Sequence, residues 1–154
     1  MRPQRWLLAV MASARSRLEA ATGLALVTRT LRQTFHAWRG RVATSGVSLR
    51  PGPVIAMPGI QLVDANDAQL DISERFELRG GRLVLKAGAS LPIIPSGSRV
   101  EIEYVAGFGA AADVPDDLLH ALRLILLAAY RREADATIPA EAEAIIASRR
   151  GMQL

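Results

Sequence analysis

The sequence predicts an α+β fold in which both ends of the chain form a helical bundle and a small, mostly antiparallel β module is inserted between them. Three observations lead to this class. Apolar residues recur at helical spacing near the N-terminus, Gly and Pro separate short β-like runs in the middle, and a strongly apolar helical segment follows near the C-terminus. With 154 residues, half of them hydrophobic, the chain has enough apolar material for one packed domain.

We expect a single domain over residues 1–154, built from four consecutive parts. These are an N-terminal helix (1–23), a β module (24–105), a loop with the main helix (106–138), and a C-terminal helix with a tail (139–154). In the first part, apolar residues spaced by three and four predict a helix from about Arg5 to Ala21. Gly23 stands where a left-handed residue would end that helix.

The segment Leu24–Trp38 changes from helical spacing to a period of two, with several threonines on one parity. This alternation favours a long strand, although Val27, Leu31 and Phe35 also fit a helix. The sequence alone does not decide between a strand and a helix for this segment.

Short strands are expected between the turns of the β module, over Val47–Leu49, Gln61–Asp64, Phe76–Leu78, Leu83–Lys86 and Arg99–Val105. Gly80-Gly81 predicts a hairpin turn and Ala65-Asn66-Asp67 another turn. Prolines are not expected inside central strands or helices; the module contains Pro51, Pro53, Pro58, Pro92 and Pro95.

The main helix is expected to start with Pro115 in its first turn and to run to about Glu133 or Ala134, followed by a shorter helix over Glu141–Arg150. Its polar stripe is interrupted by Leu127, in a stretch that is apolar almost all round. Such a helix is buried on every side, by its own domain or by a neighbouring subunit. We therefore expect a subunit interface at Leu127, Tyr130 and Arg131.

Several kinds of chemistry are excluded by composition. There is no cysteine and only two histidines, His36 and His120, so neither a disulfide framework nor a multi-histidine metal site is expected. No apolar run approaches the ~20 residues that span a membrane. The residues present no credible catalytic group, and we expect neither an enzyme nor a membrane protein.

Gly107-Phe108-Gly109-Ala110-Ala111-Ala112 formally matches a dinucleotide-binding fingerprint. However, Asp113, Asp116 and Asp117 crowd the helix start, where a pyrophosphate would have to lie. Glu101 and Glu103 likewise read as a solvated strand face, not as a catalytic carboxylate pair. No cofactor is therefore expected.

Positive charge is concentrated at the N-terminus: residues 1–41 contain eight arginines and one glutamate, although the whole chain carries only +4. This asymmetry fits contact with nucleic acid or an acidic protein surface, and it also fits a solvated arginine-rich face. A small nucleic-acid-binding module that uses this segment is the alternative function.

The order of several short motifs is similar to that of a known family. The motifs are Tyr104–Gly109, Val114-Pro115, the helix ending Tyr130-Arg131-Arg132-Glu133, the junction Ala14–Leu26, and the proline corner Leu49–Val54. Together they cover roughly residues 12–135 and resemble the head–tail connector (adaptor) proteins of long-tailed phages and of gene transfer agents. The resemblance departs at the start, Met1-Arg2-Pro3-Gln4-Arg5, where family members often carry an additional acidic helical segment.

The resemblance implies a structural subunit in the neck of a virion or virion-like particle assembled in the bacterial cytoplasm. Such subunits form a ring, commonly of twelve, on the portal protein, extend the DNA channel, and support the next neck component, a stopper or tail terminator. The C-terminal segment commonly engages the portal, and here the candidate contacts are Arg149, Arg150, Met152 and Leu154. Arg29 and Arg32 are the candidates for non-specific contact with DNA in the channel.

Overall fold

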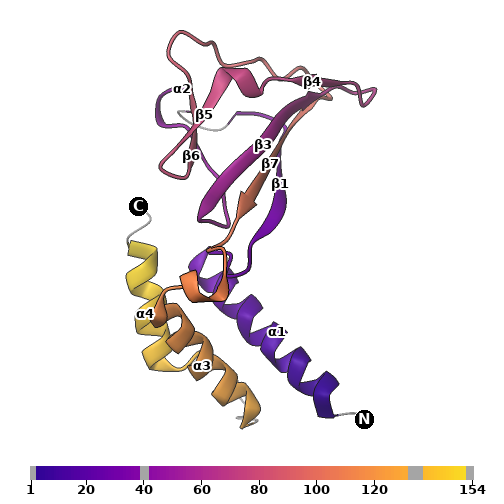
Figure 1. The fold of residues 1–154 in the computed structure, drawn as a ribbon. Helices are drawn as coiled ribbons and strands as arrows, with labels where there is room; N and C mark the ends of the chain where they lie inside the picture. The colour runs from indigo at the N-terminus through magenta and orange to yellow at the C-terminus, as the bar shows by residue number, and fades with distance from the viewer. Residues whose placement is uncertain (1–2, 39–41, 132–136, 152–154) are drawn as a thin grey trace. The chain divides into compact units, whose positions relative to one another are not determined.

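The computed structural model describes residues 3–38, 42–131 and 137–151. The chain divides into two compact units. Residues 1–27 and 108–154 form the first, here called the helical unit, and residues 28–107 form the second, the β unit. The predicted α+β class is confirmed, with helices from both chain ends packed together and antiparallel sheets between them in sequence (Figure 1).

The helical unit contains α1 (Pro3–Thr22), α3 (Asp116–Tyr130) and α4 (Ala140–Gly151), with a short 3-10 turn, η2 (Ala111–Asp113), ahead of α3. Helix α1 ends as predicted: Gly23 has φ of +69° and donates its N–H to the Glu19 carbonyl at 2.8 Å. The buried side chains of its core come from all three helices, from the segment after α1 and from the residue after η2; they are Ala14, Leu18, Leu24, Leu26, Val114, Leu118, Ala121, Ile125, Ala142 and Ile146.

The strand expected from Leu24 starts later, because β1 spans Arg29–Phe35. Leu24 and Leu26 instead pack into the core of the helical unit. The Leu26 N–H donates a hydrogen bond to the Glu19 carboxylate at 2.8 Å. This bond holds the segment against α1, so its backbone does not join a sheet.

The main helix is also shorter than expected. It ends at Tyr130, and Pro115 stands at the position before its first residue. Arg131 caps the helix by donating its N–H to the Leu127 carbonyl at 3.0 Å. The last residues expected in this helix, 132–134, lie outside the described part of the chain.

The β unit contains two antiparallel sheets. The larger has the order β1 (Arg29–Phe35), β7 (Arg99–Ala106), β3 (Val54–Val63), β4 (Gln69–Asp71); the smaller has the order β2 (Val47–Ser48), β6 (Arg82–Leu85), β5 (Phe76–Arg79). Two short helical turns, α2 (Val42–Ser45) and η1 (Ser73–Arg75), complete the described elements of this unit.

Strand β7 organises the larger sheet, since it pairs with β1 on one side and β3 on the other. Its side chains alternate strictly between buried and half-buried: Val100, Ile102 and Tyr104 are buried, whereas Glu101 and Glu103 lie on the polar face. This alternation confirms the orientation expected from the sequence.

The predicted turns are present. Gly80 and Gly81 both have positive φ and join β5 to β6, with Arg79 opposite Arg82. In the second turn, the Asp64 carboxylate accepts the N–H groups of Asn66 and Ala68 at 2.8 and 2.9 Å. The short strand β4 that follows it was not expected.

Pro58 lies inside β3, a central strand, contrary to the expectation for the prolines. Its place in the ladder explains the exception. The pairing of β3 with β7 shifts register between Ala56 and Gly59, so Pro58 falls in an irregular stretch where a missing N–H breaks no regular ladder bond.

Candidate assembly surfaces

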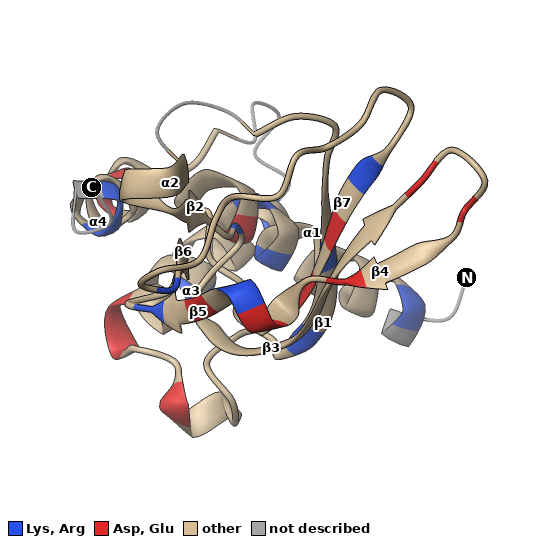
Figure 2. Cartoon of the chain, turned by 90° about the horizontal axis from the view of Figure 1, so that it is seen from above, with Lys and Arg blue, Asp and Glu red and all other residues tan. Residues whose placement is uncertain are grey.

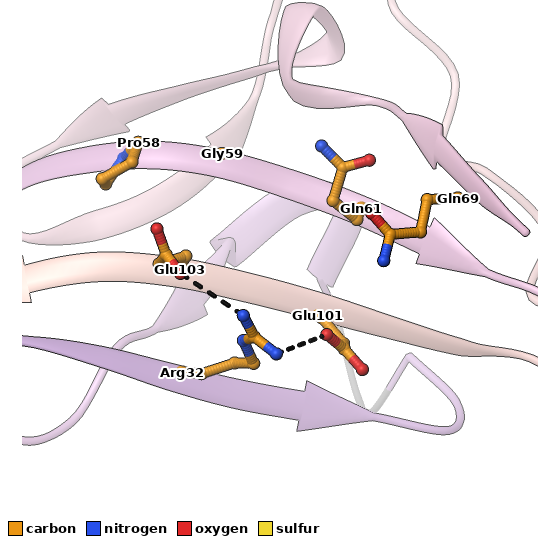
Figure 3. Close-up of a pocket in the computed structure, with 7 residues that line it drawn as sticks. All are labelled: Arg32, Pro58, Gly59, Gln61, Gln69, Glu101 and Glu103. Carbon is orange, nitrogen blue, oxygen red and sulfur yellow. Dashed lines mark hydrogen bonds and ion pairs between the residues drawn. The ribbon is translucent and has the colours of Figure 1, made fainter. Parts of the chain in front are cut away.

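The polar face of the larger sheet carries a shallow pocket of about 200 Å³. Four neighbouring strands contribute its walls (Figure 3), and the lining residues are Arg32, Pro58, Gly59, Gln61, Gln69, Glu101 and Glu103. Arg32 on β1 stands directly opposite Glu103 on β7 in the strand register. The pocket is therefore a product of strand pairing, with cations and carboxylates on adjacent strands.

Each carboxylate in this pocket is matched by a guanidinium. Arg32 lies 3.2 Å from Glu101 and 3.5 Å from Glu103, as the dashed lines of Figure 3 show. Arg99 reaches Glu101 at 2.7 Å and Asp67 at 2.9 Å, and these two hydrogen bonds raise the pKa of Arg99 above its ordinary value. Blue and red segments accordingly follow one another along β7 in Figure 2.

This arrangement can hold a polar or charged group of a partner, but it does not resemble a catalytic pair. Both glutamates are held in ion pairs, Glu101 with Arg32 and Arg99 and Glu103 with Arg32, so neither faces an open substrate site. The glutamates belong to a charged strand face, as the sequence suggested.

The two candidate DNA contacts lie on β1. Arg29 is half-buried at the start of the strand, and Arg32 is exposed but paired with two carboxylates. A phosphate approaching Arg32 would therefore also approach Glu101 and Glu103, which would oppose its binding.

The loop that matches the dinucleotide fingerprint already contains its own anion. The Asp113 carboxylate accepts the N–H of Ala110 at 2.9 Å, and a Cβ added at Gly109 would lie 2.9 Å from the same carboxylate oxygen. Gly107 has φ of +140° and fits tightly against Thr28. The glycines therefore serve the path of the backbone, and a carboxylate occupies the position where a phosphate would bind.

Two of the candidate portal contacts lie on α4 and make bonds inside the helical unit. Arg149 pairs with Asp117 on α3, with its Nε 2.7 Å from Oδ2, and this partner lowers the pKa of Asp117. Arg150 donates its Nε–H to the Ala21 carbonyl on α1. The other two candidates, Met152 and Leu154, lie outside the described residues.

The three candidates for a subunit interface lie at the C-terminal end of α3. Leu127 is 44% exposed and Tyr130 57% exposed, and Arg131 is exposed as well. The expectation that α3 is covered on every side is therefore not met within the subunit. The Tyr130 ring contacts Trp6 of α1, with 5.6 Å between ring centroids.

Next to these residues an apolar groove runs between α1 and α3. Its volume is about 340 Å³ and its lining residues are Leu8, Met11, Ala12, Ala14, Arg15, Leu122 and Leu126. Sequence reasoning did not single out this groove, because helical spacing shows which residues share a face and not whether a second helix covers them. The exposed apolar surface at this end of α1 is a candidate assembly surface that the sequence prediction missed.

His120 is exposed and lies 3.0 Å from Glu141 on α4. His36 is also exposed. Over residues 3–38, 42–131 and 137–151, no cluster of three His, Cys, Asp or Glu side chains is arranged to hold a metal ion. Nor does this part of the chain contain a helix with the length and hydropathy to cross a lipid bilayer.

Comparison with known proteins gives matches among solved structures, whereas no protein-family model and no curated protein matches this sequence. A chain from the virion of a native gene transfer agent particle is 30% identical, with a TM-score of 0.84, over 97% of this chain and 79% of its own length. A chain from the neck of an empty gene transfer agent particle, computed with C6 symmetry, is 31% identical with a TM-score of 0.80. This match covers 94% of this chain and 76% of the length of the other.

A third match is a chain from the neck of a native gene transfer agent particle, computed with C12 symmetry. It is 32% identical with a TM-score of 0.80, over 94% of this chain and 81% of its own length. The similarity thus extends through the helical unit and the β unit alike. Because it combines this identity with nearly full coverage, the protein belongs to the family of these gene transfer agent neck chains.

Proposed function

We propose that this protein is a structural head–tail connector (adaptor) subunit in the neck of a gene transfer agent or phage particle. It assembles as a ring on the portal protein, extends the DNA channel, and presents a platform to the next neck component, a stopper or tail terminator. The proposal rests chiefly on one observation, the nearly full-length similarity to a chain from a neck with C12 symmetry. Twelve subunits are the proposed stoichiometry, and the role is structural instead of enzymatic.

The C-terminal part of the chain, residues 139–154, is the proposed portal-binding segment. In the described part, the internal bonds of Arg149 and Arg150 hold α4 against α3 and α1. Arg149 is therefore proposed to position the segment, whereas the exposed Arg150 is the better candidate for direct contact. Met152 and Leu154 remain proposed contacts.

The outer face of α3 is the proposed site of contact between subunits. Leu127 and Tyr130 are large apolar side chains left exposed on one subunit, and Arg131 adds a donor at the same end. An exposed apolar patch of this kind is typical of surfaces that become buried in an assembly.

Contact with DNA is proposed to be non-specific and weak. Arg29 and Arg32 remain the candidate residues, but Arg32 would first have to exchange Glu101 and Glu103 for a phosphate. The ring is therefore proposed to form through protein contacts, without a requirement for DNA.

The test is to mix the full chain with its portal protein in the absence of DNA and to measure native mass and particle images. A symmetric ring bound to the portal is the expected result. Arg150→Glu is expected to weaken capture by the portal, whereas Lys86→Glu, an exposed charge reversal in the β unit, is the matched control and should leave capture unchanged.

A chain that stays monomeric and ignores the portal under these conditions would overturn the proposal. Salt-dependent binding of DNA by that monomer would then support the alternative, a nucleic-acid-binding module that uses the arginine-rich N-terminal segment.

A further inference from the structure

The apolar stripe of α1 is covered along only half of its length. Ala14 and Leu18 are 1% and 0% exposed, because α3 and α4 pack on them. One and two turns earlier, on the same side of the helix, Met11 and Leu7 are 48% and 42% exposed. The inward-facing stripe therefore continues past the point where the subunit's own helices cover it.

The uncovered half borders the groove between α1 and α3. On the groove wall, near the N-terminal end of α1, Leu8 is 65% exposed. Arg15 also lines the groove, and its Nε is buried with no hydrogen-bond partner. The groove thus has apolar walls and one cation. It is therefore suited to bind a protein segment that presents small apolar side chains and a carboxylate.

Helix α4 presents an outer face with these properties. Ala142 and Ile146 are buried against the rest of the helical unit, while the opposite side of the helix exposes Ala140, Ala144 and Ala147. Small side chains allow a second helix to approach closely. Exposed Glu141 and Glu143 add negative charge in the first turn of α4.

We propose that the exposed half of α1 and its groove receive the outer face of α4 from a second copy of this chain. This inference rests on the proposed ring function. In a ring with cyclic symmetry, each interface joins two different surfaces of the same subunit, so the α1 surface must meet a surface other than itself. The α4 face complements the α1 surface in shape, because its small alanines would lie against the larger Leu8 and Met11. It also complements that surface in charge, because its carboxylates would lie near Arg15.

Cross-linking can detect this pairing directly, because the chain contains no cysteine. In the portal-bound ring, Met11→Cys combined with Ala144→Cys is expected to give a ladder of covalent oligomers with a short bismaleimide. Ala9→Cys combined with Ala144→Cys is the matched control, since Ala9 is exposed on the opposite side of α1. A ladder from the control pair and none from the Met11 pair would overturn the proposal.

Substitution provides the second readout. Met11→Glu places a negative charge on the α1 surface and is expected to weaken ring assembly by about tenfold or more. Met11→Lys, which adds a cation one turn from Arg15 and so near the carboxylates proposed to meet it, should weaken it less, and Ala9→Glu should leave it unchanged. Circular dichroism checks that each variant folds, as expected for exposed positions.

The two possible failures are distinguishable. If wild-type protein forms a ring and Met11→Glu assembles equally well, the docking of α4 on α1 is wrong and the connector function stands. If the wild-type protein forms no ring with its portal, the connector function fails and this inference fails with it.

Discussion

Gly107, at the end of β7, is a position where a single methyl group should be costly. Its φ of +140° lies in a region that is essentially restricted to glycine. A Cβ built at this residue would lie 2.4 Å from the Cα of Thr28 and 2.6 Å from its backbone N. These atoms belong to the backbone and cannot rotate away as the end of a flexible side chain could.

The cost of Gly107→Ala has two parts. Backbone strain contributes about 1–3 kcal/mol, and the overpacking against Thr28 contributes about 1–3 kcal/mol more. The expected loss is therefore about 4 kcal/mol in the free energy of unfolding, a large share of the roughly 5–15 kcal/mol typical of a domain. A loss of this size should also reduce the amount of folded protein available for ring assembly.

Gly88→Ala is the matched control, because Gly88 has φ of +80° but open space where its Cβ would stand. This variant should lose only the strain, about 1–2 kcal/mol. Urea unfolding followed by circular dichroism measures both values. Equal destabilisation by the two substitutions would refute the argument that Thr28 is the obstacle.

Two further predictions concern pH. Asp117→Asn should destabilise the helical unit by about 1 kcal/mol at neutral pH, a modest value because the Asp117 side chain is 41% exposed. Arg149 lowers the pKa of Asp117 below its ordinary 3.8, so this contribution is present above pH 3.8 and is lost as the pH falls through the folded-state pKa. The melting temperatures of the variant and of the wild type should therefore converge in acid. A difference that stays constant down to the lowest pH would contradict this prediction. Tyr104→Phe should cost about 1–2 kcal/mol at neutral pH, because the buried hydroxyl donates to the Arg50 carbonyl. Burial raises the pKa of Tyr104 above its ordinary 10.0, so that stability is lost as the pH rises from 10 through the folded-state pKa, and thermal melts of the variant should lack this alkaline loss.

The parts of the fold that the sequence predicted are those with local signals. The period of apolar residues and Gly23 placed α1 to within two residues at each end. The alternation in Arg99–Val105 and the Gly80-Gly81 turn predicted β7 and the β5–β6 hairpin. In each case neighbouring residues determine the backbone conformation.

Contacts between segments that are distant in the chain could not be predicted from such local signals. Arg32 and Glu103 are 71 positions apart, and only the pairing of β1 with β7 brings them together. The start of β1 was misplaced because apolar residues at Leu24 and Leu26 fit a strand, whereas their tertiary partners draw them into the helical core. Whether Met11 is covered depends on how α3 packs against α1, and the sequence of α1 alone carries no signal for that packing.

The helical unit is built from the first and the last parts of the chain, and this has a consequence for its biosynthesis. Leu18 leaves the ribosome long before Leu118 and Ile146, which belong to the same hydrophobic core. At about 5–20 residues per second, the intervening stretch takes on the order of 5–20 s to translate. The β unit can close first, once β7 is complete, and α1 must wait for α3 and α4. A chain cut short by interrupted translation therefore lacks the surface proposed to join subunits, so only finished chains would be admitted to the ring.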